Sequence, residues 1–140
     1  MEKILLIKAV EGGLAPLAVL DFDHEGDRLA FFYKWVECDC IDIVHAYGLE
    51  KYGMGNVSLV VDDEGLFKKK PIANAIGSFL YGYLEHGQPL VGNVLVVKDV
   101  HTDDGIESGG FTNEDLKSIY SAINDLVKKH NEAVAKAERG

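Results

Sequence analysis

The segment from Gln88 to Val100 (QPLVGNVLVVKDV) contains an almost continuous apolar run that ends in Val94–Val97. A strand with one face in water would alternate apolar and polar residues, so this run predicts a strand that is buried on both faces. The chain must then build a sheet that is covered on both sides. With 140 residues, 47% of them hydrophobic and 26% charged, it is long enough to do this as one domain.

The other elements follow from apolar periodicity and from turn residues. A hairpin is predicted within residues 3–22, a helix within 25–37 with Asp27 available as its cap, strands at 40–47 and 57–62, a helix from Pro71 to Gly87 and a polar, mobile loop at 101–110. This order predicts an α/β (α+β) fold: a mixed β-sheet of about five strands, with helices packed on it and a long C-terminal helix.

The last helix has the clearest start signal in the chain. Thr112 and Asp115 form a capping-box pattern, and Phe111 and Leu116 are spaced as a hydrophobic staple. The chain is expected to form a single domain over residues 1–140, in which the alanine-rich end at 131–140 either frays or faces a partner.

The segment VVDDEGLFKKKP raises the question of a site, because three carboxylates precede three lysines. Adjacent carboxylates at the end of a strand diverge, so a tight turn with positive φ at Gly65 is predicted rather than a metal site. Lys68, Lys69 and Lys70 then precede a helix N-terminus, which favours anions. They could hold a phosphate, or they could be a solvated lysine run.

The formal net charge of −9 argues against direct binding to nucleic acid, since such modules are usually basic. The negative charge either keeps the protein soluble or attracts a basic partner, as it would in a protein that imitates DNA. No apolar run approaches the roughly 18 residues that a bilayer span needs, so a cytoplasmic protein without membrane contact is expected. Cys38 and Cys40 are expected to be free thiols.

Motifs that carry catalysis are missing from the sequence. There is no GxSxG elbow, phosphate-binding GxxxxGK[ST] loop, GxGxxG fingerprint or HExxH pair. We therefore expect no catalytic residues, no metal and no cofactor. A nucleophilic cysteine would need a histidine brought near it by the fold, which leaves a small enzyme as an alternative.

Flat and amide side chains gather around the second helix. Tyr81, Tyr83 and His86 follow Asn74 and precede Asn93. Planar rings with amides suit recognition of a nucleobase or a peptide. The alternative is that the tyrosines are ordinary core and surface residues.

Residues 59–97 carry a family resemblance. The stretch LVVDDEGLFKKKPIANAIGSFLYGY followed by QPLVGNVLVV, with Pro71, Asn74, Tyr81 and the Val91-Gly92 step, resembles the domain-of-unknown-function family 3846. Its members are small proteins common in phages, plasmids and bacterial genomes that carry mobile elements. The helix-strand segment before residue 59 also fits loosely, so the resemblance covers about two thirds of the chain; the segment ECDC, the loop YGLEKYGMGN and the C-terminal helix depart from it. It carries no catalytic residues and implies a setting where anti-defence proteins are frequent.

Three hypotheses follow. The first is a non-catalytic accessory protein that sequesters a small anionic nucleotide-like ligand to counter bacterial defence in the host cytoplasm. The expected ligand-binding residues are Arg28, Trp35, Lys68, Lys69, Lys70, Asn74, Tyr81, Tyr83, His86 and Asn93. The second is an acidic, DNA-mimic inhibitor of a basic host protein, and the third is a small nucleotide hydrolase. A homo-oligomer is also expected, because one helix face cannot bury all the aromatic residues between Phe31 and Trp35.

Overall fold

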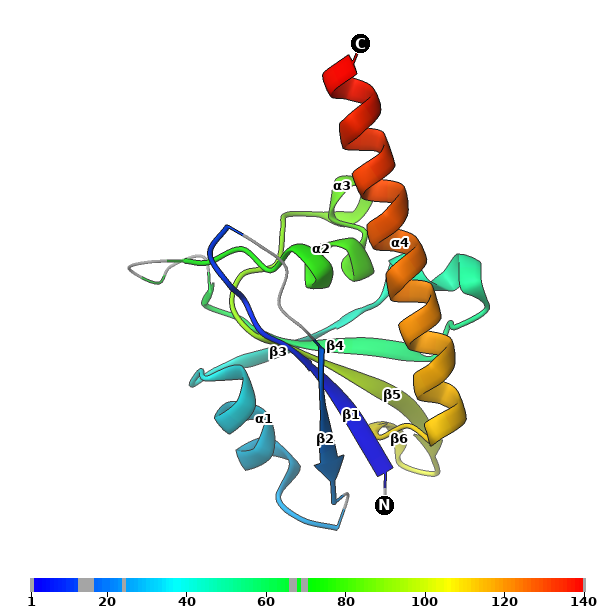
Figure 1. The fold of residues 1–140 in the computed structure, drawn as a ribbon. Helices are drawn as coiled ribbons and strands as arrows, with labels where there is room; N and C mark the ends of the chain where they lie inside the picture. The colour runs from blue at the N-terminus through cyan, green and yellow to red at the C-terminus, as the bar shows by residue number, and fades with distance from the viewer. Residues whose placement is uncertain (1, 13–16, 24, 66–67, 69–70, 140) are drawn as a thin grey trace.

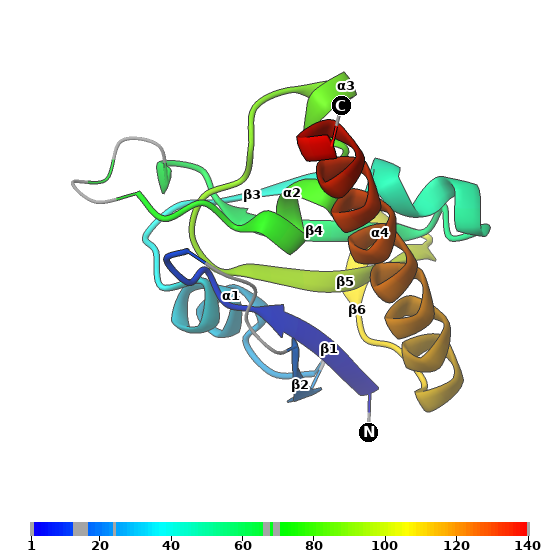
Figure 2. The same ribbon diagram turned by 45° about the horizontal axis from the view of Figure 1, so that its top comes forward.

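The computed structural model describes residues 2–12, 17–23, 25–65, 68 and 71–139. Its elements are β1 (Glu2–Ile7), β2 (Leu17–Phe22), α1 (Arg28–Val36), β3 (Ile41–His45), the 3-10 helix η1 (Tyr47–Tyr52), β4 (Val57–Asp62), α2 (Ala75–Tyr81), α3 (Tyr83–His86), β5 (Val94–Thr102), β6 (Gly105–Gly109) and α4 (Asn113–Arg139). One sheet separates α1 from α2, η1 and α4 (Figure 1). Figure 2 shows the same layers from a second direction. The predicted fold class is therefore confirmed.

The sheet has six strands in the order β2-β1-β5-β4-β3, with β6 pairing to β5. Every one of these pairings is antiparallel, so the expected mixture of strand directions was wrong. The mixture was inferred from the order of the elements, in which strands and helices alternate. The connection between β4 and β5 contains α2 and α3, but β5 begins at the end where β4 stops and runs back beside it.

The sixth strand lies in the segment that was expected to be a mobile loop. β5 continues to Thr102, and the chain then reverses so that Thr102 pairs with Gly105. Gly105 has a φ of 125°, which glycine adopts without steric cost. The Asp104-Gly105 dipeptide is a hairpin signal that the polarity of the segment obscured.

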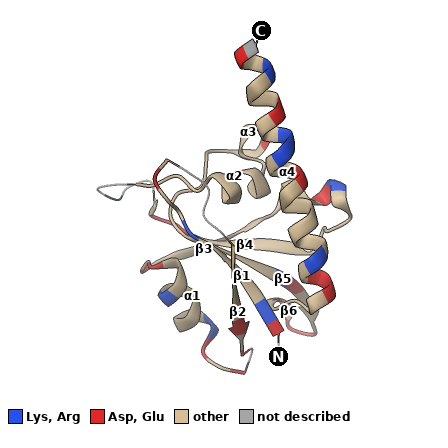
Figure 3. Cartoon of the chain, viewed as in Figure 1, with Lys and Arg blue, Asp and Glu red and all other residues tan. Residues whose placement is uncertain are grey.

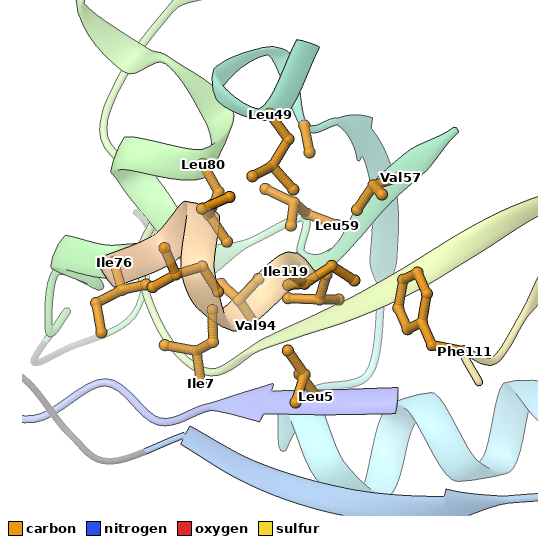
Figure 4. Packing of buried hydrophobic residues seen from close by; sticks show 14 of the residues in the cluster. Leu5, Ile7, Leu49, Val57, Leu59, Ile76, Leu80, Val94, Phe111 and Ile119 are labelled. Atoms are coloured by element: carbon orange, nitrogen blue, oxygen red, sulfur yellow. The ribbon is translucent and has the colours of Figure 1, made fainter. Parts of the chain in front are cut away.

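Strand β5 lies in the middle of the sheet between β1 and β4, and the side chains of Val94–Val97 are fully buried. This confirms the strand predicted from the apolar run. Alternation along β1 divides the core in two: Leu5 and Ile7 face α2 and α4, whereas Ile4 and Leu6 face α1. Figure 4 shows the first of these clusters, including Leu5, Ile7, Leu59, Ile76, Leu80, Val94 and Ile119.

Helix α1 begins where the sequence predicts, because the Asp27 carboxylate accepts a hydrogen bond from the Ala30 N–H at 3.0 Å. Its aromatic residues pack within the chain. Phe32 is buried, and Phe31 contacts Phe22 edge to face with ring centroids 5.4 Å apart. Neither Phe31 nor Trp35 is among the exposed large apolar side chains. The reason for expecting a homo-oligomer is thereby removed, and the oligomeric state stays a prediction.

The carboxylates after β4 form a turn, as predicted, but Gly65 is not in a positive-φ conformation. A Cβ at Gly65 would lie 3.1 Å from the Val91 carbonyl oxygen, so glycine is favoured here by a close backbone approach instead. Asp62 is buried and accepts a hydrogen bond from the Glu64 N–H at 2.9 Å, while Asp63 and Glu64 are exposed.

The second predicted helix begins later than Pro71 and is broken. Asn74 caps α2 by accepting a hydrogen bond from the Gly77 N–H at 2.9 Å, and the segment before it pairs Ala73 with Val91 as an isolated bridge. Gly82 ends α2, and the short α3 follows. An asparagine cap with a buried side chain therefore outweighs the preference of proline for the first helical turn.

Helix α4 confirms both of its start signals. The Thr112 hydroxyl accepts from the Asp115 N–H at 3.2 Å, the Asp115 carboxylate accepts from the Thr112 N–H at 3.3 Å, and Phe111 and Leu116 share one buried cluster. The end of α4 projects past the sheet (Figure 1). From Lys128 to Glu138 every side chain except that of Ala135 is exposed. Among the described residues, no helix is long and apolar enough to cross a membrane.

Candidate functional site

A pocket of about 430 Å³ opens between η1, α2, α3 and α4. It is lined by Tyr47, Gly48, Glu50, Lys51, Ser78, Phe79, Gly82, Tyr83, Leu84, Glu85, His86, Leu126 and His130. Rings and apolar side chains make up much of its wall, and we call it the aromatic pocket.

Two glycines shape the aromatic pocket. Gly82 has left-handed backbone, with φ at 73°, and its N–H donates to the carbonyls of Ser78 and Phe79. This conformation ends α2 and turns α3 into a new direction. A Cβ at Gly48 would lie 2.4 Å from the Phe79 carbonyl oxygen, so only glycine lets η1 approach the end of α2 this closely.

Stacked rings hold α3 against η1. The His86 imidazole stacks on the Tyr47 ring with centroids 3.8 Å apart and planes 10° apart. The Tyr81 hydroxyl donates to the His86 carbonyl at 3.1 Å. On its other side, Tyr47 meets His45 edge to face at 4.7 Å, and His45 contacts the Glu50 carboxylate at 2.7 Å. The η1 side of the pocket is therefore largely fixed before any ligand arrives.

The opposite side of the pocket comes from α4. His130 lies against Phe79 of α2 with ring centroids 4.3 Å apart. Leu126, one turn earlier on α4, packs at the edge of the core cluster. Leu84 of α3 also lines the pocket and is 85% exposed, so an apolar side chain is available at the rim for a ligand.

A small charged network borders the pocket where η1 meets α4. The Tyr52 hydroxyl donates to the Asp125 carboxylate at 2.5 Å, and Lys129 pairs with the same carboxylate at 3.0 Å. Burial, followed by this hydrogen bond, raises the pKa of Tyr52. The hydrogen bonds from Tyr52 and Lys129 lower the pKa of Asp125, and the carboxylate in turn raises the pKa of Lys129.

Two of the residues predicted to bind a ligand lie at this site, and a third lies next to it. Tyr83 and His86 line the aromatic pocket. Tyr81 adjoins it, since its ring lies 6.1 Å from that of Tyr47, although its side chain borders a different hollow beside β3 and β4.

The two predicted asparagines have structural roles. The Asn74 amide is buried and donates to the carbonyls of Ile7 and Gly92 at 2.9 and 3.0 Å. The Asn93 amide donates to the Trp35 carbonyl and the Glu37 carboxylate. Their hydrogen-bonding groups are therefore engaged within the fold.

Lys68 joins two elements far from the aromatic pocket. Its ammonium donates to the Glu37 carbonyl at 3.0 Å and pairs with the Asp62 carboxylate at 2.7 Å, and the latter contact raises the pKa of Lys68. Lys69 and Lys70 lie outside the described residues. The helix that was expected to share an anion site with these lysines starts only at Ala75.

The last two predicted residues belong to α1, on the other side of the sheet. Arg28 donates to the Ser108 carbonyl at 3.2 Å and so ties α1 to β6. The Trp35 ring contacts Phe31 and lies under the Lys34 ammonium. Neither residue can share a ligand with the aromatic pocket.

Sequence reasoning missed several residues of the aromatic pocket: Tyr47, Lys51, Phe79, Leu126 and His130. Those on α2 and α4 were hidden in apolar stripes that predict core packing. The segment AYGLEKYG did carry a signal, because two tyrosines and a lysine stand in a segment without strand periodicity.

The groups that could act as nucleophiles are poorly placed for chemistry. Ser78 lines the pocket, but its hydroxyl donates to the Asn74 carbonyl at 2.7 Å and accepts from the Leu90 N–H at 2.9 Å. Cys38 and Cys40 are free thiols, and burial raises the pKa of Cys38, which disfavours the reactive thiolate. Within the described ranges, no three His, Cys, Asp or Glu side chains gather as a metal site would require.

Comparison with known proteins adds one finding. No curated protein and no solved structure matches the chain. The model of the family described as "Domain of unknown function (DUF3846)" matches residues 4–123, which include most of β1, all of β2 to β6 and the first part of α4 up to Ile123. Because this match spans most of the 140 residues, the chain belongs to the DUF3846 family.

Proposed function

We propose that this domain binds a small, ring-bearing, anionic ligand of the nucleotide class in the aromatic pocket and releases it unchanged. The pocket volume of about 430 Å³ falls within the range of roughly 300–1,000 Å³ that is usual for small-molecule sites. Apolar walls with a few polar groups are also usual for such sites.

The observation that carries this proposal is the set of flat side chains on both sides of the pocket. Tyr83 and the stacked Tyr47–His86 pair lie on the η1 and α3 side, and Phe79 with His130 lies on the other. Stacking of a base on an aromatic side chain contributes about 1–3 kcal/mol and tolerates different bases. Held rings lose little conformational entropy when they bind a planar ligand.

The biological role that we propose rests on the family resemblance. In phages, plasmids and other mobile elements, a protein that binds a nucleotide-like signal without destroying it would act by sequestration. Such a protein would work in the cytoplasm of the bacterial host and lower the free concentration of a signal used in defence.

Titration calorimetry with ribonucleosides and their mono-, di- and cyclic phosphates tests the proposal. We expect saturable binding of at least one of these compounds, and Tyr83→Ala should weaken it roughly tenfold because a stacked ring is lost. Tyr33→Ala is the matched control, since Tyr33 is also half-buried but lies on α1 across the sheet. Its affinity should equal that of the parent. If the parent binds none of these compounds, the acidic protein-protein inhibitor becomes the better account of this chain.

A further inference from the structure

We infer that the aromatic pocket has a distinct anion subsite at the junction of η1 and α4, where Lys51 and Lys129 bind the phosphate group of the ligand. This inference rests on the proposed function, because it assigns the two halves of a nucleotide to two parts of one pocket.

The two lysines converge on one side chain. The ammonium groups of Lys51 and Lys129 lie 5.5 and 5.8 Å from the centroid of the Tyr52 ring. Lys51 lines the aromatic pocket, and Lys129 directly precedes His130, which lines it from α4. Lysine side chains are flexible point charges, so both can turn toward a phosphate placed between them.

The carboxylates at this junction are engaged by other groups, although Asp125 also interacts electrostatically with Lys51. Asp125 pairs with Lys129 and also accepts the Tyr52 hydroxyl, whereas Glu50 is engaged with His45. Within the described part of the chain, no carboxylate lies within ion-pairing distance of Lys51. Among the described residues, Lys51 has no salt bridge and Lys129 has one, to Asp125. An incoming anion therefore meets both ammonium groups.

Acidic residues of the pocket limit where a phosphate can lie. Glu85 lines the pocket from α3 with an exposed side chain, and Glu50 lines it beside Lys51 but contacts His45. A phosphate is repelled by Glu85 and is attracted by the two lysines at the junction of η1 and α4. The ring of the same ligand then lies between Tyr83 and His130.

The charge along the chain changes sign at the same place. Residues 124–140 contain four basic and three acidic residues, so their net charge is +1. Residues 1–123 have a net charge of −10, and the two parts together give the total of −9. Figure 3 shows basic residues recurring along α4. On a molecule that repels anions overall, this end is the favourable approach for a phosphate.

The residues that complete the subsite follow the family match, which ends at Ile123. Leu126, Lys129 and His130 are all beyond it. The second half of α4 thus supplies Leu126 and His130 to the wall of the pocket and Lys129 next to that wall, and with Lys51 this lysine makes phosphate-bearing ligands preferred over neutral ones.

The test compares each ribonucleoside with its monophosphate and diphosphate by calorimetry, on the full chain. Replacing both lysines, Lys51→Gln with Lys129→Gln, should weaken binding of the phosphorylated compounds tenfold or more and change binding of the nucleoside by less than about twofold. The pair Lys51→Arg with Lys129→Arg keeps both charges and should retain most of the affinity. Raising the salt concentration should weaken nucleotide binding in the parent more than in the glutamine pair.

Lys128→Gln with Lys136→Gln is the matched control, because it removes two exposed charges from the same helix. If this control loses as much nucleotide affinity as the first pair, general charge acts and no subsite exists. The subsite is also refuted if the glutamine pair binds nucleotides as the parent does, or if the parent binds nucleosides and nucleotides equally well. In both of these cases the pocket and the proposed function stand. A parent that binds neither class refutes both proposals.

Discussion

The imidazole ring of His86 lies flat against the ring of Tyr47, with centroids 3.8 Å apart and planes inclined by 10°. This contact joins α3 to η1 in the wall of the aromatic pocket. Helix α3 has four residues and none of them is buried, so packing against the core does not hold it. The stack and the hydrogen bond from Tyr81 to the His86 carbonyl keep α3 in place.

Removing the Tyr47 ring should therefore loosen α3 without unfolding the domain. For Tyr47→Ala we expect faster amide hydrogen exchange across Tyr83–His86 and a loss of unfolding free energy of about 1 kcal/mol, because the aromatic contact is lost. Tyr47→Phe keeps the ring and should exchange like the parent. Unchanged protection of α3 in the alanine variant would show that other contacts hold this helix.

Gly82 should tolerate alanine poorly. Its φ of 73° is unfavourable for any residue with a Cβ, and a Cβ there would lie 3.3 Å from the His86 ring. We expect Gly82→Ala to lower the free energy of unfolding by about 1–2 kcal/mol, measured by urea denaturation. The control is Gly55→Ala, where nothing lies within 4 Å and φ is not positive, and which should change stability by less than about 0.5 kcal/mol. Equal effects of the two substitutions would contradict the assigned role of Gly82.

Asn74 should matter for stability and not for direct contact with a ligand. Asn74→Ala removes the cap of α2 and leaves the buried carbonyls of Ile7 and Gly92 without its amide donor. The expected loss is about 2–4 kcal/mol in chemical denaturation. Asn131→Ala, at an exposed position of α4, should stay within about 0.5 kcal/mol of the parent. A stable Asn74→Ala protein that has lost ligand affinity would instead return Asn74 to the binding residues.

Acid should weaken the start of α4. Burial opposes ionisation of Asp115, but hydrogen bonds from Thr112 and the Lys98 charge prevail and hold its pKa below the usual value. A carboxyl whose pKa is lower in the folded state stabilises the fold above its unfolded pKa of about 3.9, and this stabilisation is lost as the pH falls through the folded pKa. In thermal unfolding, Asp115→Asn should reduce the fall in stability below about pH 4. Glu114→Gln, at the exposed neighbouring position, should follow the parent; if it does not, the acid effect arises elsewhere.

Local rules predicted a large part of the fold. The apolar run at Val94–Val97 predicted the central strand, Asp27 predicted the start of α1, and Thr112 with Asp115 predicted the start of α4. Each of these signals depends only on residues that are close together in the sequence. The hairpin between β5 and β6 also had a local signal in Asp104-Gly105, which was passed over because the surrounding residues are polar.

The site was harder to predict because its residues meet only through tertiary structure. Lys51 and His130 are far apart in the sequence, and they share a pocket because Gly48 lets η1 approach α2 and Gly82 redirects α3. Tyr83 and His86, which line the pocket, were among the predicted residues because they stand in a tract rich in rings. The structural role of Asn74 was not predicted, because a buried cap and an exposed amide look alike in a sequence.

The measurement that tests the central claim most directly is two-dimensional NMR of the labelled protein during titration with nucleotides, since it shows where a ligand binds. The account predicts that the largest shift changes fall on Tyr47, Tyr83, His86 and His130, together with Lys51 and Lys129 when the ligand carries a phosphate. The NMR resonances of residues in α1 across the sheet, such as Trp35, should not shift. Shift changes centred on Lys68 or on α1, or none with any nucleotide tested, would contradict it.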